Sequence, residues 1–267
     1  MNRRLRFKDV SRILSAVRRY GPATFKKGFS VTSFEMASRL RYYVGDLRSV
    51  IDVGANIGQF AVAVHHYFAS AEIFSIEPVP SNVGTLIRNL GGIRKATVLE
   101  FAVGDVDGEI DFFSNNYSPA SSALRVSDQQ NSLFPETSKT SLIKVPVRRL
   151  DSVGIQIPVK SPSLLKLDVQ GYEKRVLEGG RTFLKSIDFL LLEMSFVEMY
   201  RGECLFEEMH EYLRSFGLSL VAPLGFLLSN DSLVIQMDAL YSINQDGAPL
   251  AGNQQHEVRY KQGSGPK

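Results

Sequence analysis

The segment from Val50 to Phe60 constrains the fold more than any other part of the sequence. It reads Val-Ile-Asp-Val-Gly-Ala-Asn-Ile-Gly-Gln-Phe, an apolar run that leads through a glycine-containing turn into a helix-like segment. Gly54 and Gly58 allow the main chain to pass close to a ligand that a β-carbon would block. The start of the following helix offers free N–H groups and positive potential. This segment therefore predicts a ligand-binding strand–turn–helix unit in an α/β domain.

From residue 48 onward, short apolar runs alternate with runs of helical period. This pattern is typical of βαβ units and predicts a Rossmann-like α/β fold, with a mostly parallel twisted sheet flanked by helices. We expect strands at residues 49–53, 72–77, 97–103, 109–113, 143–147, 163–168, 188–193, 218–221 and 232–237. We expect helices at residues 29–45, 57–68, 81–90, 174–185 and 205–216, and a polar loop or lid at residues 114–141.

The charge is distributed unevenly along the chain. Residues 1–28 carry nine Lys or Arg and one acid, a net charge of +8, whereas the whole chain carries +3, so the remainder carries −5. We therefore divide the chain into a basic N-terminal helical arm (1–47), one α/β domain (48–244) and a tail (245–267) that loses apolar periodicity and is expected to be disordered.

The arm carries an apolar stripe within its basic segment. Phe7, Val10, Leu14 and Val17 recur at helical spacing over residues 5–20. Such a helix suits peripheral contact with an anionic membrane through residues 1–28, or packing against the acidic domain. No apolar run approaches the roughly 20 residues of a spanning helix, and no secretory signal is visible. We expect a cytoplasmic protein, with contact at the inner face of the membrane left open.

The turn after the first strand lacks the dinucleotide fingerprint. It reads Gly-Ala-Asn-Ile-Gly, so Asn56 occupies the middle glycine position of G-x-G-x-x-G. This departure argues against an NAD-type oxidoreductase and suits a cofactor with an amino-acid tail and no phosphate. Glu77 ends the second strand, where a carboxylate can accept hydrogen bonds from both ribose hydroxyls of an adenosine. Asn82 stands where its side chain could reach the adenine.

Acidic residues recur at the ends of the expected strands, which is the edge where open α/β sheets bind ligands. Five like charges at one edge repel each other, and a cationic sulfonium ligand would relieve that repulsion. These residues are Asp52, Glu77, Asp105, Asp168 and Glu193.

The segment from Lys166 to Glu173 reads Lys-Leu-Asp-Val-Gln-Gly-Tyr-Glu. Lys166 and Asp168 share one face of a strand, because side chains alternate along it. Gly171 permits a sharp turn, and Glu173 opens the next helix, where a negative charge is favourable. We predict that Lys166, Asp168 and Glu173 form one charged cluster, serving either a reaction or only a structural salt bridge and helix cap.

These segments together resemble the FkbM-type methyltransferase family over about residues 48–240. The resemblance is carried by IDVGANIG (51–58), EPVP (77–80), the serine pair 121–122, KLDVQGYE (166–173) and LE (192–193). It implies a class I methyltransferase fold, S-adenosylmethionine as methyl donor, and a hydroxyl acceptor on a sugar, glycan or secondary metabolite. Two features depart from the family pattern: Ala123 follows the serine pair, and the basic arm lies outside the family's domain.

If methyl transfer is the reaction, each candidate residue can be given an expected chemical role. A hydroxyl needs a proton acceptor during attack, and Asp168 is the first choice, with Glu193 second. Lys166 would hold the base cluster or the acceptor oxygen. Gly54, Asn56, Gly58 and the acids Asp52, Glu77 and Asp105, with Asn82, would hold the cofactor.

Alternatives remain at this point. The basic arm leaves open an RNA methyltransferase or nucleic-acid-binding protein, although the acidic domain and the few aromatic residues of the arm disfavour nucleic acid. A non-catalytic scaffold is disfavoured by the intact Asp52, Glu77 and Asp168. A single cysteine, Cys204, excludes an internal disulfide and a cysteine-rich zinc site. No sequence feature requires a metal, although a magnesium ion bound by Asp168 and a neighbouring carboxylate stays open. The sequence indicates neither the acceptor nor the oligomeric state.

Overall fold

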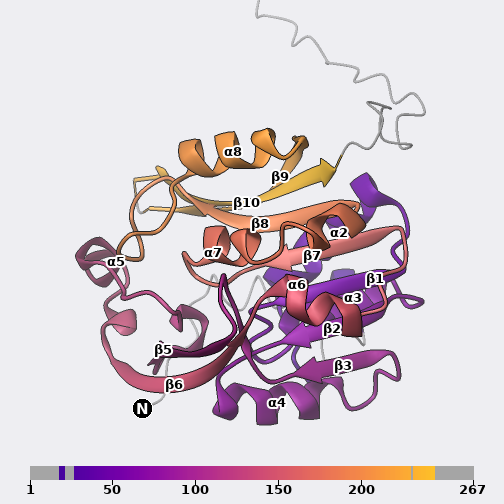
Figure 1. Ribbon diagram of the computed structural model, residues 1–267, viewed down its shortest axis with the longest axis horizontal. Helices are drawn as coiled ribbons and strands as arrows, with labels where there is room; N and C mark the ends of the chain where they lie inside the picture. The colour runs from indigo at the N-terminus through magenta and orange to yellow at the C-terminus, as the bar shows by residue number, and fades with distance from the viewer. Residues whose placement is uncertain (1–17, 22–26, 230, 244–267) are drawn as a thin grey trace, which may run out of the picture.

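A computed structural model describes residues 18–21, 27–229 and 231–243. A seven-stranded central sheet runs through it in the order β3-β2-β1-β7-β8-β10-β9 (Figure 1). Strands β1, β2, β3, β7 and β8 are mutually parallel, whereas β10 is antiparallel to both of its neighbours. The strands are β1 (Ser49–Val53), β2 (Glu72–Ile76), β3 (Ala96–Leu99), β7 (Ser163–Leu167), β8 (Phe189–Ser195), β9 (Leu218–Leu228) and β10 (Val234–Ile243).

Helices cover both faces of this sheet. The first face packs against α2 (Val31–Val44), α3 (Gln59–Tyr67) and α4 (Pro80–Leu90), and the second against α6 (Leu150–Val153), α7 (Glu173–Glu178) and α8 (Phe206–Ser215). Because side chains alternate along a strand, Val50 belongs to the first core and Ile51 to the second. Both central strands β1 and β7 are buried throughout, which explains why they read as continuous apolar runs.

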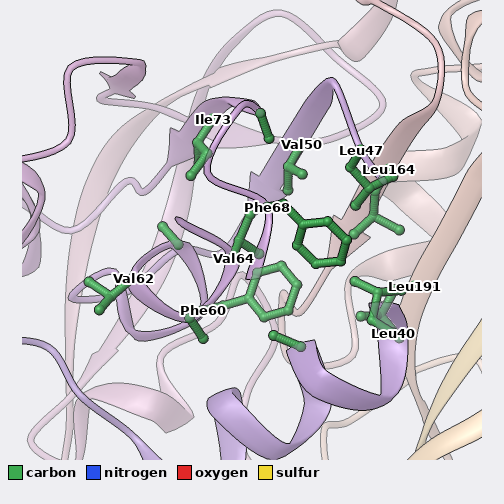
Figure 2. Packing of buried hydrophobic residues seen from close by; sticks show 14 of the residues in the cluster. Leu40, Leu47, Val50, Phe60, Val62, Val64, Phe68, Ile73, Leu164 and Leu191 are labelled. Carbon is green, nitrogen blue, oxygen red and sulfur yellow. The ribbon is translucent and has the colours of Figure 1, made fainter. Parts of the chain in front are cut away.

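The first core is built around α3. Figure 2 shows Phe60 and Val64 of this helix, and Phe68 directly after it, beside Val50 and Leu164 of the sheet. Val64 and Phe68 are fully buried, and Phe60 is nearly so. This packing fixes the start of α3, and therefore the turn between β1 and α3, relative to the ends of the strands.

Helix α2 belongs to the same core, which changes the expected boundary at residue 48. Phe34, Ala37 and Leu40 are fully buried, and Leu40 lies close to Leu191 of β8 in Figure 2. Residues 31–44 are thus part of the α/β domain and not of a separate arm. Their buried residues pack in the first core together with α3 and the sheet.

A second, three-stranded sheet follows β3 in the chain. Its order is β4-β6-β5, with β4 (Ala102–Val103), β5 (Gly108–Asn115) and β6 (Thr140–Arg148). The single strand expected at 97–103 is therefore wrong: β3 pairs with β2, and β4 pairs with β6. The hairpin-type dipeptide Asp107-Gly108 does precede a strand, and β5 pairs with β6 in antiparallel register.

The polar segment between β5 and β6 is compact. It contains the short helices η2 (Ser118–Ala120), α5 (Asp128–Leu133) and η3 (Pro135–Ser138), and α5 lies at the left of the view (Figure 1). Ser127 caps α5 by accepting a hydrogen bond from the Gln130 N–H.

Other bounds also differ from expectation. Helix α7 ends at Glu178 instead of 185, at the pair Gly179-Gly180, and Gly179 packs so closely on Gly104 that a β-carbon there would overlap its carbonyl oxygen. The chain continues through η5 (Phe183–Ser186), and η4 (Gly154–Gln156) follows α6. Strands β9 and β10 are longer than expected because they pair with each other along their length.

The apolar stripe at residues 5–20 falls, except for residues 18–20, outside the described residues, as does the tail 245–267. Residues 18–20 are helical, and the Tyr20 ring packs against Phe34, with 5.3 Å between ring centroids. No helix in the described part of the chain is long and apolar enough to cross a bilayer.

Candidate active site

A cavity of about 610 Å³ opens at the carboxyl ends of β1, β2, β7 and β8. The first turn of α2, the start of β10 and the segment between β5 and β6 complete its wall. Six of the residues expected at the site line it: Gly54, Asn56, Glu77, Lys166, Asp168 and Glu193. Asp52, Gly58, Asn82, Asp105 and Glu173 do not.

The turn between β1 and α3 is shaped by three residues with left-handed backbone, Gly54 (φ +80°), Asn56 (φ +48°) and Gly58 (φ +86°). A β-carbon at Gly54 would overlap the carbonyl oxygen of Asp168, and one at Gly58 would lie 2.7 Å from Leu86 Cδ1. The two glycines therefore serve close packing within the protein, and not only the approach of a ligand. No side chain caps α3, so its first N–H groups are left for other acceptors.

Glu77 is buried directly after β2. Its Oε2 accepts a hydrogen bond from the Asn56 N–H at 2.9 Å, and its Oε1 accepts from the Val79 N–H at 3.0 Å and from Asn82 Nδ2 at 3.1 Å. Burial raises the pKa of Glu77, and these three hydrogen bonds oppose that effect. The carboxylate is thus held in a fixed orientation at the cavity wall. Since it has about four lone-pair positions, it retains capacity for a ligand hydroxyl.

Two expected cofactor residues lie away from the cavity. Asn82 is buried behind Glu77 and orients it, so its amide does not face the space where an adenine was expected. Asp105 pairs with Arg175 at 3.0 Å and lies 3.5 Å from the Tyr172 hydroxyl. Its position at a strand end was correct, but β4 belongs to the second sheet, and this turns Asp105 away from the ligand edge.

A buried ion-pair chain joins β1 to β7. Lys166 Nζ lies 3.2 Å from Asp52 Oδ1 and 3.2 Å from Asp168 Oδ2, and 5.2 Å from the centre of the Phe60 ring. Asp52 and Lys166 are register partners on adjacent strands. Burial lowers the pKa of Lys166, but Asp168 and Asp52 outweigh it and raise that pKa above its ordinary value. Lys166 is therefore a fixed cation that holds Asp168 and neutralises Asp52.

Gln170 links Asp168 to Glu193. Its Nε2 donates to Asp168 Oδ1 at 2.7 Å and to Glu193 Oε2 at 3.0 Å, while its Oε1 accepts from the Tyr200 hydroxyl at 2.6 Å. Gln236 Nε2 also donates to Glu193 Oε2, at 2.9 Å. Burial, followed by the nearby Asp168, raises the pKa of Glu193 well above its ordinary value. The two amide donors hold Glu193 Oε2 in a fixed position at the cavity wall.

Glu173 is buried and does not line the cavity. Its Oε1 accepts from the Val169 N–H at 2.9 Å, closing the turn that follows Asp168. Burial raises the pKa of Glu173 to about 8, against the opposing hydrogen bonds from the backbone. The expected cluster of Lys166, Asp168 and Glu173 is thus present in part: Lys166 and Asp168 are paired, whereas Glu173 supports the turn.

The segment between β5 and β6 is attached to both halves of the site. Ser118 Oγ donates to Asn56 Oδ1 at 3.1 Å, and Ser122 Oγ donates to the Gln170 carbonyl at 2.7 Å. Ser121 Oγ accepts from the Asn115 N–H at 2.9 Å and so shapes the segment itself. The serine pair therefore connects this wall of the cavity to the segment after β7.

Sequence reasoning missed Asp238, Gln236, Gln170 and Tyr200. Gln236 and Asp238 are spaced two apart on an otherwise apolar strand, which was a usable signal, but the strand was expected to stop at residue 237. Asp238 is the register partner of Glu193 and lines the cavity. Burial, followed by the nearby Asp168, raises the pKa of Asp238 to about 6. Among the described residues, no group of three or more His, Cys, Asp or Glu side chains is arranged to hold a metal ion.

The sheet order, with the antiparallel β10 inserted between β8 and β9 and a cavity at the carboxyl ends of the parallel strands, defines a class I methyltransferase fold. The sequence model of the Methyltransferase FkbM domain matches residues 52–220, and the chain belongs to this family and is a methyltransferase.

Two curated relatives and one solved structure illustrate the similarity. The chain is 29% identical over 182 residues to the 2-O-methyltransferase NoeI of Sinorhizobium fredii, covering 66% of this chain and 75% of that one. It is 26% identical over 144 residues to the hexuronic acid methyltransferase AglP of Haloferax volcanii, covering 54% of each chain. The crystal structure of a methyltransferase FkbM from Methylobacillus flagellatus aligns at a TM-score of 0.49 and 16% identity, covering 86% of this chain and 52% of that one.

Proposed function

We propose that this protein transfers the methyl group of S-adenosylmethionine to a hydroxyl of a sugar, glycan or other small metabolite. The observation that carries the proposal is one cavity with two chemically distinct walls. Glu77 and Asn56 provide hydrogen-bonding groups on one side, and the Lys166–Asp168 pair lies on the other. The names of the relatives, a 2-O-methyltransferase and a hexuronic acid methyltransferase, support an oxygen acceptor on a carbohydrate.

The residues of the first wall fit S-adenosylmethionine. Glu77 offers a buried, pre-oriented carboxylate for ribose hydroxyls, and the glycine-containing turn brings the Asn56 side chain to the cavity. The excess of acidic groups at this edge suits a positively charged sulfonium. When bound, the cofactor supplies a methyl group that is already activated, so the protein's main task is to align the acceptor oxygen with it.

Asp168 is the residue suited to take the acceptor proton. Its side chain is 39% exposed, toward the cavity, and Lys166 and Gln170 fix its two oxygens. Glu193, the second choice, is less suited because burial, followed by the nearby Asp168, raises its pKa well above the ordinary value and so disfavours the carboxylate form that a base requires. Lys166 orients Asp168 and is itself held too firmly as a cation to act as a base. The segment between β5 and β6 lines one wall of the cavity, and we propose that it closes over the acceptor and excludes water during the reaction.

Calorimetric titration with S-adenosylmethionine tests the cofactor site. We expect Glu77→Ala to lose about 1–3 kcal/mol of binding free energy, because buried ribose hydroxyls lose a charged acceptor. Glu100→Ala is the matched control, since Glu100 is an exposed acid at the end of the neighbouring strand β3. Equal affinities of wild type and Glu77→Ala would move the cofactor elsewhere.

Methyl transfer to the true acceptor tests the base. We expect Asp168→Asn to bind the cofactor and to lose about 10²–10⁴ in rate. Asp105→Asn is the control, because Asp105 is also acidic and follows a strand but lies outside the cavity. Wild-type turnover by Asp168→Asn would reject Asp168 as the base and return the role to Glu193.

We also propose peripheral contact of residues 1–28 with an anionic membrane surface, supported by their net charge of +8. Co-sedimentation with vesicles that contain anionic lipid tests it. Because Tyr20 packs in the core with Phe34, the basic residues of positions 3–19 should be replaced by Gln rather than deleted. The full chain should bind at low ionic strength, and the neutralised variant should not. Equal behaviour of the two would refute the contact.

A further inference from the structure

Asp238 differs from the other deep carboxyl groups of the cavity in its hydrogen bonding. Glu77 accepts three hydrogen bonds, and Asp168 and Glu193 each accept two. Asp238 is partly buried on β10 and lines the same cavity, yet no described residue donates a hydrogen bond to it. A ligand that fills the cavity would shield this carboxylate from solvent, and burying it without a donor is costly, so the ligand should supply that donor.

The neighbouring strand makes room for this carboxylate. Gly225 of β9 is the register partner of Asp238, and a β-carbon at residue 225 would overlap Asp238 Oδ2. On the other side, Glu193 of β8 is the opposing residue, so the two acidic side chains project from the same face of the sheet. Asp238 therefore occupies a defined place on the cavity wall, beside Glu193.

The charges around the cavity restrict what can enter. Five acids line it, and Lys166 is the one basic residue among its described lining. Lys166 is already paired with Asp52 and Asp168. Arg39 lies near Asp238, but it donates to the Leu224 carbonyl and does not line the cavity. The acids are Glu77, Glu136, Asp168, Glu193 and Asp238.

We infer that Asp238 binds the acceptor by accepting a hydrogen bond from one of its hydroxyl or amino groups, and that the acceptor is a neutral or amino sugar without an acidic group. This inference rests on the proposed function and narrows its substrate class. An acidic sugar would add a negative charge beside Asp168 and Asp238, while Lys166, the one basic residue of the described lining, is already paired with two carboxylates; like charges in a desolvated site repel strongly. The acceptor expected here therefore differs from the hexuronic acid in the name of one relative.

Three sugars with the same ring test the inference: methyl glucoside, glucosamine and glucuronate. Their binding to the full chain saturated with S-adenosylhomocysteine can be titrated by saturation-transfer NMR. We expect methyl glucoside and glucosamine to bind, and glucuronate to bind at least about 10-fold more weakly. Binding of glucuronate as tightly as the others, or binding of no sugar, would overturn the inference.

Variants of the β9–β10 pair test the role of Asp238 itself. Asp238→Asn should weaken the binding of both accepted sugars about 10- to 100-fold, because a charged acceptor is lost. Gly225→Ala should also weaken the binding of both sugars, although it changes no charge, because the new β-carbon displaces Asp238 Oδ2. Asp231→Asn is the matched control, since Asp231 is exposed on the connection between the same strands. Unchanged sugar binding by Asp238→Asn would reject the assignment.

A failure of the proposed function can be distinguished from a failure of the inference about Asp238. Calorimetry on the same preparations measures S-adenosylhomocysteine binding independently of any sugar. If the cofactor product does not bind, the proposed function fails and the inference fails with it. If it binds and the sugars behave otherwise than expected, only the assignment of Asp238 and of the acceptor class is rejected.

Discussion

The buried Glu173 makes a quantitative prediction about stability and pH. Its side chain is 4% exposed, and burial raises its pKa to about 8 in the folded protein, against 4.5 ordinarily. Between these two values the unfolded chain releases this proton while the folded protein keeps it. The free energy of unfolding therefore falls as pH rises from 4.5 to 8, by up to about 5 kcal/mol at about 1.4 kcal/mol per unit.

Glu173→Gln removes this contribution and preserves the shape of the side chain. The Gln amide oxygen can still accept from the Val169 N–H, which Glu173 Oε1 does now at 2.9 Å. We expect the variant and wild type to be nearly equally stable at pH 5. The variant should become more stable by several kcal/mol at pH 8.5, because it never has to bury a charge.

Urea unfolding of both proteins across this pH range measures the effect. Other acids with raised pKa, such as Glu193 and Asp238, change stability in the same direction, but they are common to both proteins and largely cancel in the difference. Glu109→Gln on the exposed part of β5 is the control and should show no pH-dependent difference. A constant difference between Glu173→Gln and wild type from pH 5 to 8.5 would refute the reasoning.

Two further substitutions test the packing that forms the site. Lys166→Met should cost about 3–5 kcal/mol of unfolding free energy, because it leaves Asp52 buried without a counter-charge, and the double variant with Asp52→Asn should recover part of that loss. A loss in the double variant equal to the sum of the single losses would contradict this account. Gly54→Ala should cost at least about 2 kcal/mol in denaturant unfolding, because φ is +80° and the new β-carbon overlaps the Asp168 carbonyl, whereas Gly92→Ala, with nothing within 4 Å, should be nearly neutral. Comparable losses for the two alanine variants would show that the close approach at Gly54 is not limiting.

The sequence predicted the parallel part of the sheet well, because buried parallel strands are short apolar runs with clear ends. Strands β1 and β7 were placed correctly to within a residue. The division between β3 and β4 was not visible, since residues 97–103 are one apolar stretch and only long-range pairing separates them into two sheets. The burial of α2 likewise depends on tertiary contacts, and the basic residues that precede this helix gave no indication of its burial.

The candidate site was partly predictable for a related reason. A residue at a strand end or in a tight turn can be located from local pattern, and Gly54, Glu77, Lys166 and Asp168 were found this way. Local pattern does not reveal which way a strand end faces, and Asp105 was misplaced in consequence. Asp238 lies at the site because β10 pairs with β8, a pairing that joins residues 45 positions apart in the chain, and local pattern does not reveal it.

The position of β10 has a consequence for how the chain assembles. β10 follows β9 in sequence but lies between β8 and β9 in the sheet. During synthesis, β8 must therefore wait with an open edge until β10 has emerged, and such edges are prone to pair with other chains. A nascent chain halted before residue 234 would already contain Glu77, Lys166 and Asp168 but would lack the strand that carries Asp238. The wall that carries Asp238 is thus the last part of the cavity to form, so an incomplete chain could display the cofactor-facing residues well before the opposite wall exists.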